Sequence, residues 1–307
     1  MIYTLTLNPA LDYNLVLNDL ELGGINKAQE AVLQCGGKGI NVSATLHCLG
    51  VESCALGFLA GFTGKEIERR ALKYGLATDF LWLAHGESRI NVKVKALEET
   101  DINANGPIVS AEEVQALYSR LEQLCAGDIL ILSGSLPRGL DVNIYAAIVQ
   151  KVQAKGVRCI VDAAGEPLKA AIEQAPFLIK PNLEELGMLH GGRLSGAEDA
   201  YECAKKILQK GVRYVLVSMG EQGAMLCSLQ HGAYVIPAAT GKVRSTTGAG
   251  DALLGGFVAR YSQMEDALMA LQWGVAAGCA STFAGRWPEK SGIFEQLARL
   301  PGGYYIG

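Results

Sequence analysis

Short apolar runs alternate along the chain with longer segments whose apolar residues recur every three or four positions. The runs with strand character are 2–7, 129–133, 159–162, 177–179 and 214–217, and the helical segments are 40–49, 111–125, 142–154, 197–209 and 249–261. Strands that are apolar on both faces are typical of parallel sheets covered by helices. The pattern therefore predicts an α/β fold in which helices flank a mainly parallel central sheet.

Two segments depart from this rhythm, residues 10–35 and 86–108. Within the second, Ile90, Val92 and Val94 alternate with polar or charged residues, which is typical of a strand with one solvent-exposed and one buried face. We expect a small β-sheet that stands off the main body as a lid. No Pro/Ser-rich linker or internal repeat divides the chain, so residues 1–307 are predicted to form one domain with this lid.

Composition narrows the class of ligand. Half of the residues are hydrophobic and 19% are charged, which excludes a disordered chain. The 27 basic and 31 acidic residues give a net charge of -4, so no uniform positive field exists to hold a nucleic acid or an anionic membrane surface. An anionic ligand would have to be held locally.

The eight cysteines are scattered and include no CxxC pair, so we expect reduced thiols and neither a zinc ribbon nor a disulfide framework. The first residues show no basic leader with an apolar signal run, and no stretch is continuously apolar over the ~18 residues of a membrane span. These features predict a soluble, cytoplasmic protein.

The most informative segment is 245–256, a turn of small residues that leads directly into a helical pattern. Gly248 and Gly250 allow backbone amides to approach a ligand, and the start of the following helix favours a phosphate. Asp251 lies in the first turn of that helix. It could cap the helix, or it could accept a proton from a hydroxyl that attacks a phosphoryl group.

Other glycine motifs fit poorly. Leu253 occupies the position of the third glycine of a dinucleotide fingerprint, which disfavours a Rossmann oxidoreductase. Residues 61–65 lack the first glycine and the Ser/Thr of a P-loop, and they are better interpreted as a turn and a helix start.

Eight segments together resemble the ribokinase-like pfkB carbohydrate kinases, in particular their branch of 1-phosphofructokinases and tagatose-6-phosphate kinases. In the order of the family they are 6–12, 36–42, 89–93, 99–107, 133–139, 180–185, 217–220 and 246–251. The resemblance covers nearly the whole chain, although residues 301–307 have no counterpart in it. It implies a ribokinase-like layered fold and an ATP-dependent phosphosugar kinase.

The resemblance also implies roles at the phosphoryl-transfer centre. Asp251 would be the catalytic base, with the amides of Gly248, Ala249 and Gly250 as the anion hole. The nucleotide-binding positions would be Lys180, Asn182, Ser218, Gly220, Gly223 and Thr246. Glu185 would hold Mg²⁺ through water, and ATP would be the co-substrate. Asn182 and Glu185 could equally cap a helix, and a hairpin turn explains Gly220 and Gly223 as well.

For the sugar, the resemblance implies contacts from Asp12, Gly36, Gly37, Lys38, Gly39, Asn41, Arg89, Asn91 and Ser135. An Asx turn at Asp12 and a helix cap at Asn41 are the alternatives. Lys38 and Arg89 suit a second phosphate carried by the sugar, because charge-assisted contacts to phosphate are strong. Either residue could instead be ordinary surface charge.

The expected substrate is fructose 1-phosphate, with tagatose 6-phosphate as the rival and free sugars or nucleosides more distant. A catalytically silent sugar-phosphate sensor is the alternative from another class of protein. Relatives with such lids often pair through them, so we expect a homodimer in which Ile90, Val92 and Val94 face a partner sheet. The same residues could instead cover their own domain.

Overall fold

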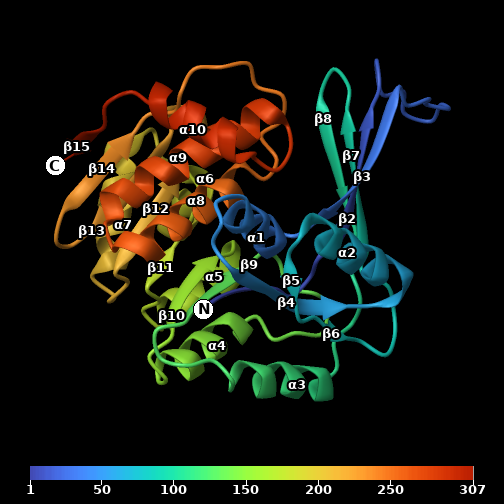
Figure 1. Cartoon of the computed structure of the whole chain (residues 1–307), viewed down its shortest axis with the longest axis horizontal. Helices are drawn as coiled ribbons and strands as arrows, with labels where there is room; N and C mark the ends of the chain where they lie inside the picture. The colour runs from blue at the N-terminus through green and yellow to red at the C-terminus, as the bar shows by residue number, and fades with distance from the viewer. Residues whose placement is uncertain (307) are drawn as a thin grey trace.

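The apolar runs of the sequence form the core strands of an eleven-stranded sheet in the computed structural model, which describes residues 1–306 (Figure 1). The strand order is β15-β14-β13-β12-β11-β10-β9-β1-β4-β5, with β6 paired to β4. From β12 to β6 the pairs are parallel, whereas β13, β14 and β15 add an antiparallel edge. The bounds are β1 (Ile2–Thr6), β4 (Ser53–Leu59), β5 (Ala77–Thr78), β6 (Leu81–Trp82), β9 (Ile129–Ser133), β10 (Arg158–Asp162), β11 (Leu178–Ile179), β12 (Tyr214–Ser218), β13 (Ala224–Ser228), β14 (Gly232–Ile236) and β15 (Tyr304–Ile306).

Helices cover both faces of this sheet, as predicted. One face packs against α3 (Ala111–Leu121), α4 (Ile144–Gln153), α5 (Gly165–Ile172), α6 (Leu183–His190) and α7 (Ala197–Leu208). The other face packs against α1 (Lys38–Cys48), α2 (Gly61–Tyr74), α8 (Ala249–Met264) and α9 (Ala267–Ala284), while α10 (Lys290–Arg299) lies on α9. A 3₁₀ turn, η1 (Gly220–Gln222), joins β12 to β13.

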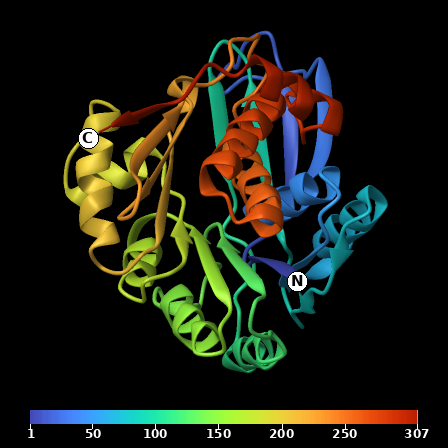
Figure 2. The same cartoon turned by 60° about the vertical axis from the view of Figure 1, so that its left-hand side comes forward.

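A separate four-stranded sheet stands out at the upper end of the molecule in both views (Figures 1 and 2). Its order is β3-β2-β7-β8, with bounds β2 (Ala10–Val16), β3 (Glu30–Gly36), β7 (Arg89–Lys95) and β8 (Glu99–Asn103). The four strands lie in the two segments that were expected to form the lid, except that β3 continues one residue farther, to Gly36. The alternation in β7 places Arg89, Asn91 and Lys93 on one face, and Ile90 and Val92 on the other.

Close helix contacts bring the start of α8 to the sheet. A Cβ at Gly255 would lie 2.6 Å from the Thr45 side chain, and one at Gly256 would lie 2.5 Å from the Trp273 carbonyl oxygen. Only glycine allows α1 and α9 to approach α8 this closely. Asp251, in the first turn of α8, is thereby fixed relative to the first turn of α1.

Helix α9 has no polar face because α8, α10 and the sheet surround it, and so its sequence carries no amphipathic signal. It is long and apolar enough to resemble a membrane span by composition, with a mean hydropathy of 1.3, yet 56% of its residues are buried inside the protein. This is the behaviour of a core helix.

The remaining differences from the sequence prediction are local. Helix α3 ends at Leu121 instead of near residue 125, and α8 continues to Met264, beyond the predicted residue 261. The glycine-rich segment 61–65 begins α2, as the sequence indicated. Within the tail that had no counterpart, residues 304–306 form β15, whereas residue 307 lies outside the described part of the chain.

Candidate active site

A cavity of about 390 Å³ lies between the lid and the carboxyl ends of the parallel strands, and it unites most of the predicted residues. Its lining is Asp12, Gly37, Lys38, Asn41, Arg89, Asn91, Lys93, Asp101, Asn103, Lys180, Asn182, Glu185, Ser218, Thr247, Gly248, Gly250 and Asp251. The positions expected to bind sugar, nucleotide and phosphoryl group therefore share one space. Ligands of open α/β sheets bind at this same edge.

The start of α8 has the properties of an anion site. Gly248 adopts a left-handed conformation (φ 78°) as the N-cap, with no side chain capping the helix. Among the hydrogen bonds of residues 1–306, the amides of Gly248, Gly250 and Asp251 have no acceptor, whereas the Ala249 amide donates to the Thr246 carbonyl oxygen at 3.2 Å. Three free donors at a helix N-terminus favour a phosphoryl group. The Ala249 amide was expected to contribute to the anion hole, but it already has an acceptor within the protein.

The side chain of Asp251 turns away from its own helix. Its Oδ2 accepts a hydrogen bond from Asn41 Nδ2 at 2.7 Å, and its Oδ1 lies 3.8 Å from Lys38 Nζ. Burial raises the pKa of Asp251, although the ammonium of Lys38 works against that rise. The helix-cap interpretation of Asp251 is therefore wrong, and the carboxylate is a stronger base than an exposed aspartate.

A second buried carboxylate, Asp162 at the end of β10, holds two lysines at the cavity. Asp162 Oδ1 lies 3.0 Å from Lys38 Nζ and 3.3 Å from Lys180 Nζ. Burial alone would raise the pKa of Asp162, but Lys180 and Lys38 together lower it. Both carboxylates in turn raise the pKa of Lys38, against the effect of burial. Lys38 is therefore a fixed cation beside Asp251.

Asp162 was not among the predicted site residues. Sequence reasoning identified it only as the end of an apolar strand, and the chain around it has no glycine-rich motif. The available signal was its position, because a carboxylate directly after a buried parallel strand lies at the edge of the sheet where sites form.

The lid contributes a polar wall of opposite charges. Asp12 Oδ1 accepts a hydrogen bond from Asn91 Nδ2 at 2.9 Å, and burial raises the pKa of Asp12. Lys93 Nζ lies 3.0 Å from Asp101 Oδ2. Arg89 donates through Nε to the Asn8 carbonyl oxygen at 3.0 Å, and it forms no ion pair among residues 1–306. Arg89 is half-buried and lines the cavity, so it is not an ordinary exposed surface charge, and burial lowers its pKa.

Asn182 and Glu185 form a reciprocal helix cap and also line the cavity. The Glu185 amide donates to Asn182 Oδ1 at 2.7 Å, and the Asn182 amide donates to Glu185 Oε2 at 2.9 Å. The capping interpretation is therefore confirmed. Ser218 lies beside Asn182, because the two residues form a parallel β-bridge where their strands end.

Seven predicted residues lie outside the cavity lining: Gly36, Gly39, Ser135, Gly220, Gly223, Thr246 and Ala249. Two of these glycines make room for neighbours, since a Cβ at Gly36 would lie 2.2 Å from Asp12 Oδ2 and one at Gly39 would lie 2.5 Å from Thr6 Oγ1. Gly223 has φ 88°, which fits the turn between β12 and β13, and a Cβ there would lie 2.0 Å from the Ile236 carbonyl oxygen of β14. The lining also contains Lys93, on the same face of β7 as Arg89 and Asn91, and it adds Asp101, Asn103 and Thr247, which the sequence did not indicate.

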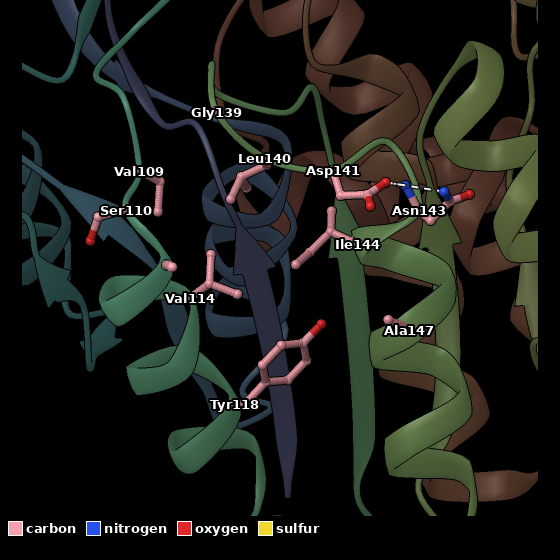
Figure 3. Close-up of a pocket in the computed structure, with 11 residues that line it drawn as sticks. Val109, Ser110, Val114, Tyr118, Gly139, Leu140, Asp141, Asn143, Ile144 and Ala147 are labelled. Atoms are coloured by element: carbon pink, nitrogen blue, oxygen red, sulfur yellow. Dashed lines mark hydrogen bonds between the residues drawn. The ribbon is translucent and has the colours of Figure 1, made fainter.

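A second cavity, of about 350 Å³, lies between α3 and α4, remote from these residues (Figure 3). Val114 and Tyr118 of α3 face Ile144 of α4 across it. Its carboxylate, Asp141, already accepts hydrogen bonds from the backbone and side chain of Asn143. This cavity brings together no predicted site residue, and its chemistry is mostly apolar.

A cavity in which a buried base lies beside free helix amides and faces an arginine of the lid without a carboxylate partner is suited to phosphoryl transfer onto a small anionic acceptor. These features define the class, a small-molecule kinase with a layered α/β fold. Family comparison agrees, because the model of the pfkB family of carbohydrate kinases matches residues 6–285. The chain belongs to this family, and it is an ATP-dependent sugar kinase.

Individual relatives of known function align with this chain over nearly its full length. The chain is 39% identical over 300 residues to the 1-phosphofructokinase of Bacillus subtilis, covering 98% of this chain and 97% of that one. It is 34% identical over 285 residues to the D-tagatose-1-phosphate kinase of Bacillus licheniformis, covering 92% and 93% of the two chains.

Solved structures confirm the predicted ribokinase-like fold. Phosphofructokinase-2 from Escherichia coli, crystallised with substrates and products, superposes with a TM-score of 0.91 at 29% identity, over 97% of this chain and 98% of that one. Ribokinase from Arabidopsis thaliana, complexed with ribose and ATP, superposes with a TM-score of 0.78 at 20% identity, over 96% and 98% of the two chains. The second match shows the fold alone.

Proposed function

We propose that the protein transfers the γ-phosphoryl group of ATP to the terminal hydroxyl of fructose 1-phosphate, giving fructose 1,6-bisphosphate and ADP. The observation that carries this proposal is the single cavity bordered by Asp251, Lys38 and Arg89. The similarity to curated 1-phosphofructokinases at 39% and 36% identity supports the choice of substrate.

In the proposed reaction, the acceptor oxygen attacks the γ-phosphorus while its proton passes to the Asp251 carboxylate. The bond from the γ-phosphorus to the bridging oxygen breaks, and its electrons leave with ADP. The free amides of Gly248, Gly250 and Asp251 would stabilise the charge on the transferred group, with Lys38 as a fixed cation beside it. Lys180, Asn182, Ser218 and Thr247 would border the nucleotide.

This arrangement refines the role suggested for Lys38 from the sequence. Its ammonium is held by Asp162 at the transfer end of the cavity. We assign the phosphate carried by the sugar to Arg89, whose guanidinium has no carboxylate partner among the described residues. Asp12, Asn41 and Asn91 supply hydrogen-bonding groups for the sugar hydroxyls.

D-Tagatose 1-phosphate is the second candidate substrate, because a kinase for it is among the relatives at 34% identity. Fructose and tagatose differ only in the configuration at one carbon, so both 1-phosphates would present the same two ends to Arg89 and Asp251. Tagatose 6-phosphate, the rival named from the sequence, would instead have to bind in the opposite direction, with its C1 hydroxyl as the acceptor.

The residues at the cavity fit a magnesium ion held mainly through water and phosphate. Within residues 1–306 no cluster of three His, Cys, Asp or Glu side chains exists that could hold a metal. Mg²⁺ typically needs only one or two carboxylates besides waters and nucleotide phosphates. Glu185, with Asn182 beside it, would hold the ion, which supplies neutralisation of phosphate charge when bound.

A coupled assay of ADP release tests the proposal. Fructose 1-phosphate is expected to give the highest kcat/KM, D-tagatose 1-phosphate a lower one, and fructose 6-phosphate, tagatose 6-phosphate and free fructose rates lower by about 10²-fold or more. Omission of Mg²⁺ is expected to abolish release. Binding of sugar phosphates without any release would instead favour a silent sensor, and a preference for a 6-phosphate would overturn the choice of substrate.

We further propose that the chain is one kinase domain which pairs with a second copy through the outer face of its lid. Helix α2 packs against the base of that face. On the same side of the sheet, Tyr13, Ile90 and Ile102 are 38%, 40% and 60% exposed. An apolar patch of this kind is typical of an interface. One structure of Escherichia coli phosphofructokinase-2 is described as tetrameric, which supports association within the family.

Replacement of Ile102 by Lys is expected to convert a dimer into monomers in sedimentation velocity, because a charge would be buried at the interface. Leu229→Lys is the control, since Leu229 is also exposed but lies in the β13–β14 turn. An unchanged sedimentation coefficient for both variants, or a wild-type monomer, contradicts pairing through the lid.

We also propose a cytoplasmic location. All eight cysteines are free thiols, and five of them are buried, which suits a reducing compartment.

A further inference from the structure

A tryptophan outside the cavity lining is connected to the proposed base by two hydrogen bonds. Trp287 Nε1 donates to Asn41 Oδ1 at 2.8 Å, and Asn41 Nδ2 donates to Asp251 Oδ2 at 2.7 Å. The three residues come from the loop between α9 and α10, from the first turn of α1 and from the first turn of α8. The two bonds span 246 and 210 positions of the chain, so only the fold brings these groups together.

The chemistry of the indole sets the orientation of the amide. A tryptophan side chain can only donate a hydrogen bond, so the group that faces it must be the oxygen of Asn41. The amino group of Asn41 then necessarily faces Asp251. An amide turned the other way would leave the indole N–H without an acceptor and would direct an oxygen at a carboxylate. The orientation therefore follows from the donor and acceptor inventory, independently of how the atoms are assigned.

The loop that carries Trp287 is built to hold it in place. Gly285 ends α9 in a left-handed conformation (φ 68°), and the buried Ser281 hydroxyl donates to the Arg286 carbonyl oxygen at 3.1 Å. The indole packs edge-on against Tyr74 of α2, with ring centroids 4.5 Å apart. Trp287 also lies just beyond residues 6–285, which match the family model.

We propose that Trp287 is a positioning residue for phosphoryl transfer. It locks the Asn41 amide so that the amide donates to one oxygen of Asp251, which leaves Oδ1 of the same carboxylate for the acceptor hydroxyl. This inference rests on the proposed role of Asp251 as the base. Its physical consequence is that Trp287 helps to keep Asp251 ionised, because the Asn41 hydrogen bond stabilises the charged form.

The Trp287→Phe variant tests this, because it keeps an aromatic ring against Tyr74 and removes only the N–H. Without that donor the Asn41 amide is free to turn, and Asp251 loses a hydrogen bond that favours its charged form. The acid limb of the pH profile of kcat/KM is expected to move to higher pH, with kcat/KM about three- to tenfold lower on that limb. At alkaline pH, where Asp251 is ionised in both proteins, the loss should shrink.

Trp273→Phe is the matched control. Trp273 packs against Phe294 on the far side of α9 and donates no hydrogen bond among the described residues, so its variant should keep the wild-type profile. Loss of folded protein lowers the rate at all pH values alike, so a parallel drop in Trp287→Phe without a shift of the limb overturns the proposal.

A double-mutant cycle tests whether Trp287 acts on Asp251 through the Asn41 amide or directly. In an Asn41→Ala background the Trp287→Phe change should shift the profile no further, because the amide through which it acts is gone. A further shift of the same size contradicts the inference. Failure of the proposed function would give a different result. If an Asp251→Asn variant kept its turnover, Asp251 would not be the base, whatever the effect of Trp287→Phe.

Discussion

Asp251→Asn is expected to lower kcat by about 10²- to 10⁴-fold while leaving the affinity for both substrates nearly unchanged. The amide cannot accept the proton of the acceptor hydroxyl, but it keeps the shape of the carboxylate and can still bond to Asn41, which now holds Asp251 Oδ2 at 2.7 Å. Steady-state kinetics, with substrate binding measured by calorimetry, separate the two effects.

The control is Asp266→Asn, because Asp266 Oδ1 caps α9 by accepting a hydrogen bond from the Met269 amide, and the oxygen of an asparagine can do the same. This variant should match the wild type in both kcat and stability. If Asp251→Asn also stayed within tenfold of wild-type turnover, the assignment of Asp251 as the base would be wrong.

Arg89→Gln is expected to raise KM for fructose 1-phosphate by about 10- to 100-fold, because a charge-assisted contact to the sugar phosphate is lost. Free fructose, which has no phosphate, should be converted as slowly by the variant as by the wild type. The selectivity for the phosphorylated sugar over the free one should therefore collapse. Kinetics with both acceptors measure this ratio.

Arg193→Gln is the control, since Arg193 is exposed in the loop between α6 and α7, away from the cavity. An equal loss with fructose and with fructose 1-phosphate would mean that Arg89 supports the lid and does not recognise phosphate. Its hydrogen bond to the Asn8 carbonyl oxygen makes this second outcome a real alternative.

The sequence predicted those parts of the site that depend on short motifs. Gly248 and Asp251 lie in one turn, and Asn182 and Glu185 share one helix start, so spacing along the chain already implies their proximity. The period of two in β7 likewise predicted one polar face, and this face carries Arg89 and Asn91 to the cavity. In each case local geometry alone relates the residues.

The groups that sequence reasoning missed depend on tertiary contacts. Asp162 becomes important only because Lys38 and Lys180 approach it from other elements, and Trp287 only because the loop after α9 reaches Asn41 of α1. The role of Lys38 was refined for the same reason, since its partner is 124 positions away. The apolar composition of α9 likewise concealed this helix, because a helix without a polar face has no periodic pattern.

Strand β15 has a consequence for the behaviour of the protein at high concentration. It pairs with β14 at the rim of the central sheet, and it is only three residues long (Figure 2). A long, flat outermost strand would offer unpaired backbone groups on which strands of other molecules could dock and aggregate. Because β15 covers β14 and is itself too short to template another strand, the open rim of this wide sheet resists polymerisation.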